Sequence, residues 1–335
     1  MAEQGGQTRR QLLKGAIGGA AGLVLSAAAR PLHAASAQAA AVQALPASAA
    51  SGEAAIQRLA DDLFIITVPG EANVVAHTTS DGVVLVDGAS ARASDALMKA
   101  VATLPGGRPV ETIFNTHWHP EQVGSNERLG AAGKTIIAHE NTRLWLTTDV
   151  TWPWNGQRFK RLPKQAQPNK TIYTTGQLGP KERREGVPAD AVAHFGYVPE
   201  AAHTDGDLYV YFPRQNVLAV GDVVSGQGWP VVDYITGGWI GGMVGGIQRL
   251  QTLANDGTRI VPARGPVLGP KDLAAQYDMY SKIYERLTQL LNKGRGPTEA
   301  VEARPTKEFD AQMGNPDEFV RRAFESLWAY LSPDA

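Results

Sequence analysis

The apolar residues of this chain gather in short runs that predict strands. β-Branched and aromatic residues dominate these runs, and turn-forming residues bound most of them. The predicted strands lie at 63–68, 73–79, 82–86, 110–114, 134–138, 208–212, 217–220 and 258–261. Ser80-Asp81-Gly82 stands between the second and third runs, and Asp-Gly between apolar segments predicts a hairpin.

Helical spacing follows several of these strands. A helix is expected at about 92–104, with its apolar residues on one face. A second helix opens at Pro270 and runs to about Asn292, and a last one starts at Asn315-Pro316. Strands alternate with helices in each half of this region, which predicts an α/β fold of layered sheets and helices.

Three shorter segments carry local signals. A short helix is expected to start at 124–127, and Asn141 is expected to cap another helix that ends at Leu146. Residues 221–246 are rich in glycine and tryptophan, which favours a flexible loop. That loop is expected to lead into a helix at about 247–253.

Two histidines, His117 and His119, stand just past the predicted strand at 110–114. Alternate side chains of an extended backbone project to the same face, so both imidazoles can point at one metal ion. Pro120 then prevents further strand pairing. Two surface histidines on a loop are the simpler interpretation of this pair.

Three later features favour the metal site. His203 lies in Ala202-His203-Thr204-Asp205-Gly206-Asp207, directly before a predicted strand. Asp222 follows the next strand, and the hairpin between the two strands brings His203 and Asp222 close together. Arg264 lies just beyond the last predicted strand.

Together these segments resemble the metallo-β-lactamase superfamily over roughly residues 60–295. The family carries an HxHxDH motif, a later His, a bridging Asp and a final His in a Pro-Gly-His-Gly context. His117 and His119 match the first two ligands, His203 matches the third, and Asp222 matches the bridging carboxylate.

The chain also departs from the family pattern. Glu121 replaces the family's Asp, Gln122 replaces the next His, and Arg264 replaces the final His. The first three-histidine site is therefore intact, whereas the second site has lost its nitrogen ligands. Arg264 is expected to pair with Glu121 or Asp222, in place of a second metal ion.

The resemblance implies an αββα four-layer metallo-β-lactamase sandwich that holds one tightly bound Zn²⁺ at His117, His119, His203 and Asp222. It implies a zinc-dependent hydrolase of an ester, lactone, thioester or lactam. Asp222 would bind the ion or orient the attacking hydroxide. Glu121 and Arg264 complete the expected catalytic residues, as general base and as oxyanion donor.

Two other functions stay open. The chain could be a non-catalytic relative that binds a metal or ligand in a decayed site. It could also be an accessory protein of a periplasmic oxidoreductase. Family membership alone does not decide among these functions, because one fold hosts many chemistries.

Residues around the motif have expected supporting roles. We call residues 115–122, which carry His117 and His119, the metal loop. Asp87 either supports the metal loop by hydrogen bonding or serves as a turn residue. Asp205 and Asp207 are expected to orient His203. The insert at 147–170 has the length of a functional loop, and Trp152 and Trp154 in it are expected to form an apolar wall over the site, with packing on the edge of the sandwich as the alternative. The histidines His77 and His139 are interpreted as structural.

The amino-acid composition excludes several kinds of functional site. The chain has 335 residues, a formal net charge of −1 and no cysteine. Disulfides, cysteine zinc sites and cysteine nucleophiles are therefore excluded. The near-neutral charge gives no general case for nucleic acid, and the expected partner is a small-molecule substrate. The sequence leaves the oligomeric state open.

The N-terminus resembles an export signal. Thr8-Arg9-Arg10-Gln11-Leu12-Leu13-Lys14 is similar to a twin-arginine motif, and Ala35-Ser36-Ala37 offers a cleavage site. We therefore expect a signal peptide at 1–37, a disordered linker at 38–53 and a domain at 54–335. The domain ends in a helical extension from about 296. The export machinery is then a partner, and the mature protein is periplasmic or secreted, although an uncleaved membrane anchor is the alternative.

Overall fold

The computed structural model describes residues 53–180 and 192–331, which all belong to one compact unit, Val42–Ala335. The predicted export signal at 1–37 lies outside the described residues, as do residues 38–52 of the predicted linker. Within the described ranges, no helix combines the length and the apolarity that a membrane span requires.

The first sheet has seven strands in the order β1-β2-β3-β4-β5-β6-β9. They are β1 (Ala55–Arg58), β2 (Leu63–Thr67), β3 (Asn73–Thr79), β4 (Gly82–Val86), β5 (Val110–Phe114), β6 (Thr135–His139) and β9 (Lys170–Ile172). The strands β1 to β4 pair antiparallel, and those from β4 to β9 pair parallel. Thr79 pairs with Gly82, which confirms the predicted hairpin.

The second sheet has five strands in the order β10-β11-β12-β13-β14. They are β10 (Thr175–Leu178), β11 (Ala193–Tyr197), β12 (Leu208–Phe212), β13 (Val217–Gly221) and β14 (Arg259–Pro262). Neighbours pair antiparallel except β13 and β14, which run parallel. Every strand predicted from the sequence is present, with ends that differ by at most one residue.

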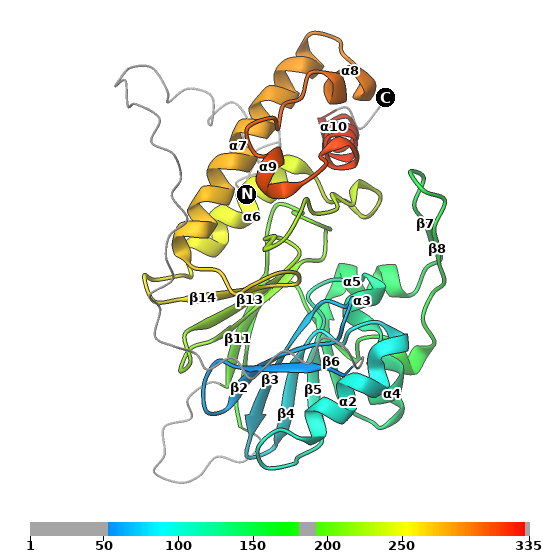
Figure 1. Cartoon of the computed structure of the whole chain (residues 1–335). Helices are drawn as coiled ribbons and strands as arrows, with labels where there is room; N and C mark the ends of the chain where they lie inside the picture. Colours follow the sequence, from blue (N-terminus) through cyan, green and yellow to red (C-terminus); the bar gives the residue numbers. More distant parts are fainter. Residues whose placement is uncertain (1–52, 181–191, 332–335) are drawn as a thin grey trace, which may run out of the picture. The chain divides into compact units, whose positions relative to one another are not determined.

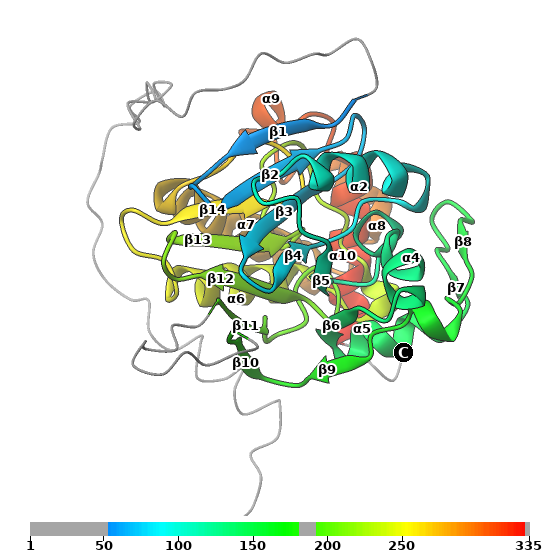
Figure 2. The same ribbon diagram turned by 90° about the horizontal axis from the view of Figure 1, so that it is seen from below.

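The two sheets pack face to face through one buried apolar cluster (Figures 1 and 2). Phe114 of the first sheet and Phe195 of the second meet with ring centroids 4.8 Å apart. Both rings are fully buried or nearly so, as are the apolar residues around them. The layer between the sheets is therefore hydrophobic core.

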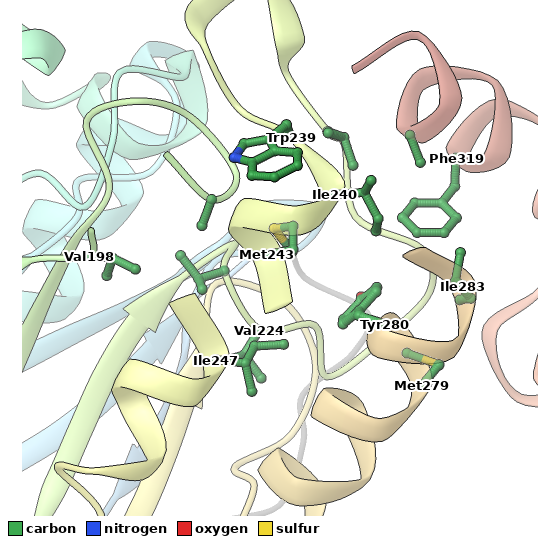
Figure 3. Close-up of a cluster of buried hydrophobic side chains, with 14 of the residues drawn as sticks. Val198, Val224, Trp239, Ile240, Met243, Ile247, Met279, Tyr280, Ile283 and Phe319 are labelled. Atoms are coloured by element: carbon green, nitrogen blue, oxygen red, sulfur yellow. The ribbon is translucent and has the colours of Figure 1, made fainter. Parts of the chain in front are cut away.

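Helices cover the outer face of each sheet. α2 (Ser94–Ala102) buries Leu97 and Val101 against the first sheet. α6 (Ile240–Gln251) and α7 (Pro270–Asn292) cover the second sheet, and α10 (Asp317–Leu331) packs against these two helices. Figure 3 shows Met243 and Ile247 of α6 facing Tyr280 of α7, with Phe319 of α10 beside them. This arrangement confirms the predicted αββα sandwich.

The remaining elements are short. They are η1 (Ala91–Ala93), α3 (Pro120–Val123), α4 (Asn126–Ala131), α5 (Glu140–Leu146), β7 (Val150–Thr151), β8 (Arg158–Phe159), η2 (Lys164–Ala166), η3 (Tyr234–Thr236), α8 (Pro297–Glu302) and α9 (Asp310–Met313). The helices after residue 296 share the apolar cluster of α6 and α7, so the C-terminal extension is packed onto the sandwich.

The prediction of a flexible loop at 221–246 is wrong for residues 240–246, because α6 already starts at Ile240. The glycines in this part serve close packing. A Cβ atom on Gly242 would lie 2.3 Å from the backbone oxygen of Ala201, and one on Gly246 would lie 2.9 Å from the Ala202 side chain. The tertiary contact between α6 and the segment at Ala201 and Ala202 thus outweighs the poor helix propensity of glycine.

The predicted cap of α5 is also wrong. His139 caps this helix, because its Nδ1 accepts the backbone N–H of Asn141 at 3.2 Å. The Asn141 side chain instead donates to the backbone oxygen of Asp205 at 2.9 Å. His139 therefore has a structural role, as predicted.

Candidate metal centre

The ends of three strands bring four predicted ligands together. His117 and His119 follow β5, His203 precedes β12, and Asp222 follows β13. One ligand atom from each residue lies within 4.8 Å of all the others. Each histidine is 1% exposed, so the cluster is buried at one edge of the two sheets.

His117 presents its Nε2 atom to the centre of the cluster. This atom lies 3.5 Å from Asp222 Oδ2, and it is buried without a hydrogen-bond partner among the described residues. On the other side of the ring, Nδ1 lies 3.1 Å from Thr116 Oγ1, which donates to Asp87 Oδ2 at 2.8 Å. The Thr116 oxygen is thus left to accept the Nδ1 proton, and the Nε2 lone pair faces the cluster.

Asp87 buttresses the metal loop, which was one of its two expected roles. Its carboxylate also accepts the backbone N–H of Thr116 at 2.8 Å. Asp87 has a φ of 65°, a left-handed conformation that short polar side chains tolerate better than most. The residue therefore combines a sharp turn after β4 with support for the ring of His117.

His203 is fixed from both sides. Its Nδ1 lies 2.6 Å from the backbone oxygen of Val231, which can only accept, so the Nδ1 proton points there. Asp207 accepts the backbone N–H of His203 at 2.6 Å and that of Thr204 at 2.9 Å, as predicted. The prediction for Asp205 is wrong, because its side chain accepts from Trp145 Nε1 at 2.8 Å.

His119 depends on a residue that the sequence did not reveal. Its Nε2 lies 3.0 Å from Oδ2 of Asp233, a fully buried carboxylate. The same oxygen accepts from Thr236 Oγ1 at 2.8 Å and from Trp152 Nε1 at 3.3 Å. Because the carboxylate accepts the Nε2 proton, the Nδ1 lone pair of His119 faces the cluster.

The only local signal for Asp233 is an acidic residue inside the apolar run Val231-Val232-Asp233-Tyr234-Ile235. Such a residue is buried only with hydrogen-bond partners, so the run could have indicated a polar network. It could not have indicated His119 as the partner, since the two residues are far apart in sequence.

Trp152 of the insert lies against His119. Its ring centroid is 5.1 Å from that of His119, and Trp118 lies 4.7 Å away at a similar angle. Trp154 contacts Tyr234 at 5.3 Å, and the Arg322 guanidinium of α10 lies 5.6 Å from the Trp154 ring. Trp152 of the insert thus packs against a candidate ligand, and Trp154 extends this aromatic surface toward Tyr234.

The three histidines converge with their lone pairs inward. His119 Nδ1 and His203 Nε2 are only 3.2 Å apart, and two lone pairs at this distance repel unless a metal ion or a proton lies between them. Burial and the neighbouring His119 lower the pKa of His203 to about 4. Burial and the other histidines also hold the pKa of His117 well below its ordinary value. His117 and His203 are thereby kept as neutral rings, the form that binds metal. For His119, the hydrogen bond and charge of Asp233 outweigh burial and raise the pKa.

The spacing of these atoms fits a small tetrahedral ion. Zinc–nitrogen bonds of roughly 2.0–2.1 Å place tetrahedral ligand atoms about 3.3 Å apart. The observed separations of 3.2 Å between His119 and His203 and 3.5 Å between His117 and Asp222 match this value. His203 Nε2 lies somewhat farther from Asp222 Oδ2, at 3.9 Å. The residues therefore fit a small divalent metal ion, of which zinc is one.

Asp222 is the most accessible member of the cluster, with 12% of its side chain exposed. Burial and the negative charge of Glu121 raise the pKa of Asp222 to about 6, against the opposing effect of Arg264. The carboxylates of Asp222 and Glu121 thus interact across the open side of the centre.

Arg264 pairs with Glu121. Its Nη2 lies 3.1 Å from Glu121 Oε1, and the side chains are 43% and 28% exposed. Burial alone would raise the pKa of Glu121, but His119 and Arg264 outweigh it and the pKa is lowered. The loop that carries Arg264 is tied to Asn73, whose Nδ2 donates to the backbone oxygens of Pro262 and Gly265, each at 3.0 Å.

Gln122 adds no charge to this side of the centre. It is fully buried, and its backbone oxygen accepts from Gly88 at 2.7 Å. Its side-chain amide has no hydrogen-bond partner in the described parts of the chain. A neutral amide therefore occupies the motif position where the resemblance implies a histidine.

Known proteins show the same fold. The family model of the metallo-beta-lactamase superfamily matches residues 67–282. A metallo-beta-lactamase from Pontibacter korlensis is 20% identical with a TM-score of 0.52, over 68% of this chain and 99% of that chain. A metallo-beta-lactamase from Erythrobacter litoralis is 18% identical with a TM-score of 0.52, over 69% and 97% of the two chains.

Replacing Asp233 with asparagine should weaken metal binding by about 10–100-fold, the range typical for partners of metal-bound histidines. The amide puts a donor where Asp233 now only accepts, and it removes the charge that holds the His119 proton. A chelator competition titration with Zn²⁺ measures the effect. Asp205→Asn is the matched control, because the Asp205 side chain bonds to Trp145 and contacts no ligand. Equal affinity in Asp233→Asn and the wild type would contradict the assignment.

Proposed function

The chain belongs to the metallo-beta-lactamase superfamily, and we propose that it is an exported, zinc-dependent hydrolase of esters, lactones, thioesters or lactams. The observation that carries this proposal is the convergence of one ring nitrogen from each of three histidines beside Asp222. The buried Nε2 of His117, which has no hydrogen-bond partner in the described ranges, supports it further.

A zinc ion bound at this centre would supply an activated water at neutral pH and would polarise a carbonyl oxygen. We assign His117, His119 and His203 as its nitrogen ligands. Asp222 either completes the set or orients the water through its carboxylate. The substrate is a small molecule that reaches the centre from the side of Asp222, where the cluster is least buried.

Glu121 and Arg264 flank that open side. We propose that Glu121 accepts the proton of the attacking water, with its orientation fixed by the ion pair to Arg264. The guanidinium carries further N–H donors, which suit the negative charge that develops on a carbonyl oxygen during attack. Both residues are partly exposed, so a substrate can reach them.

The same pair favours a single metal ion. A second divalent ion would have Glu121 and Asp222 as its strong ligands, beside a permanent guanidinium charge. Repulsion between a dication and a cation a few Å apart costs several kcal/mol even at an effective dielectric constant of about 20. The ion pair of Arg264 with Glu121 avoids this repulsion, because no second dication is then needed to balance the carboxylate. Gln122 offers only a neutral amide in place of a nitrogen ligand.

His119→Ala should abolish hydrolysis of an ester, lactone, thioester and lactam panel by the zinc-loaded protein, with a loss of at least about 10³-fold. The reason is the loss of both a ligand and the partner of Asp233. His194→Ala is the control, since His194 lies on β11 opposite Tyr211, outside the cluster. If zinc-loaded wild type turns over no panel member, the chain is a non-catalytic binding protein instead.

Gln122→His together with Arg264→His should raise the zinc stoichiometry from near one to near two per chain. The double variant restores two nitrogen ligands and removes the competing cation. Elemental analysis after identical dialysis of wild type and variant measures it. Two tightly held ions in the wild type would refute the single-ion proposal.

Arg9→Lys together with Arg10→Lys should block export, because twin-arginine signals are read through the arginine pair. The wild-type protein should accumulate in the periplasm with an N-terminus near Gln38, as mass spectrometry of the purified protein would show. Normal periplasmic accumulation of the double variant would rule out this route.

A further inference from the structure

An apolar cavity of about 280 Å³ lies between the metal loop and the insert. We call it the insert cavity. Trp118, Pro120 and Val123 line it on the side of the metal loop, and Leu146, Phe159 and Leu162 are among the residues opposite. The β7–β8 hairpin, which carries Phe159, lies on the α3–α5 side of the structure in both views (Figures 1 and 2).

The walls of the insert cavity are fixed and apolar. Trp118, Val123 and Leu146 are all less than 5% exposed and belong to one buried cluster. The indole N–H groups at the cavity are used elsewhere: Trp118 donates to Thr236 at 3.0 Å, and Trp145 donates to Asp205 at 2.8 Å. These two rings therefore have no N–H left for a ligand and present carbon surface to it.

Charged side chains occur only at the rim of the lining. Glu127, Arg158 and Lys160 are exposed, and Lys160 is neutralised by Asp149 at 2.8 Å. A charged group placed deep in the insert cavity would lose its water without gaining a partner, which is costly. The insert cavity thus suits an uncharged, apolar group.

The insert cavity lies next to a cleft that includes the ion pair of Glu121 and Arg264. Ala91 and Pro120 line both this cavity and a cleft of about 430 Å³ that includes Glu121 and Arg264. Pro120 also directly follows His119 in the chain. The insert cavity is therefore a neighbour of the two residues to which we assign the general base and the oxyanion donor.

We propose that the insert cavity receives the apolar acyl chain of an ester or thioester substrate, and that the insert sets the chain-length preference of the enzyme. This inference rests on the proposed hydrolase function. The volume of about 280 Å³ is nearly twice that of a cavity of about 150 Å³ that binds benzene, so a chain of roughly eight to ten carbons fits.

A series of p-nitrophenyl esters from acetate to decanoate tests the proposal on the zinc-loaded full chain. Each buried methylene should raise kcat/KM by up to about fourfold. We expect at least a tenfold rise from acetate to octanoate, followed by a plateau. A flat profile, together with hydrolysis of the acetate, would overturn the chain-length inference and leave the hydrolase proposal intact.

Leu162→Trp fills the insert cavity and should lower the octanoate-to-acetate ratio of kcat/KM by about tenfold. Leu144→Trp is the matched control, because Leu144 is 49% exposed on the neighbouring helix α5 and does not line the cavity. If Leu162→Trp fails to fold, Thr148→Trp at the exposed rim provides the same test with little disturbance of the core. An unchanged ratio in the folded cavity variant would overturn the proposal.

Calorimetric binding of octanoate separates the two proposals. Binding that is lost in Leu162→Trp and kept in Leu144→Trp supports the insert cavity, even if no ester of the series is hydrolysed. In that case the hydrolase proposal alone has failed. Absence of octanoate binding together with absence of hydrolysis would overturn both.

Discussion

The hydrogen bond between His119 and Asp233 is the interaction on which the rest of the site depends. His119 follows β5 of the first sheet, and Asp233 lies beyond β13 of the second, so the bond joins the two halves of the sandwich. The carboxylate fixes the proton on Nε2 and thereby turns Nδ1 toward the other ligands. The same carboxylate accepts from Thr236 and Trp152, and these donors offset the large cost of burying its charge.

A second constraint is electrostatic. The ion pair of Arg264 and Glu121 is partly exposed, so its contribution to the stability of the fold is about 0–1 kcal/mol. Its importance lies in the local charge, because a fixed cation stands where the family pattern has a metal-binding histidine. Asn73 holds the backbone on both sides of Arg264, which keeps that charge beside Glu121.

The sequence was sufficient where structure depends on local pattern. The Asp-Gly hairpin and the limits of α7 follow from nearby residues, and the cluster of His117, His119, His203 and Asp222 was expected from the resemblance to the metallo-β-lactamase superfamily. It was insufficient where the structure of a segment depends on a contact with residues far away in the sequence. From the sequence, Gly242 was assigned to a loop, because its close packing against Ala201 exists only in the folded structure. In the same way, the role of Asp233 depends on its hydrogen bond to His119, which is far away in the sequence.

The insert shows how such distant contacts connect the parts of the site. β7 and β8 pair through only two residues each, and a ribbon this short has little stability of its own. Its position is therefore set by contacts with other parts of the chain. Trp152 donates to Asp233, and Trp154 contacts Tyr234 and the guanidinium of Arg322 on α10. Phe159 of the same ribbon lines the insert cavity. Any change that moves the insert consequently acts on the orientation of His119 and on the shape of the cavity together.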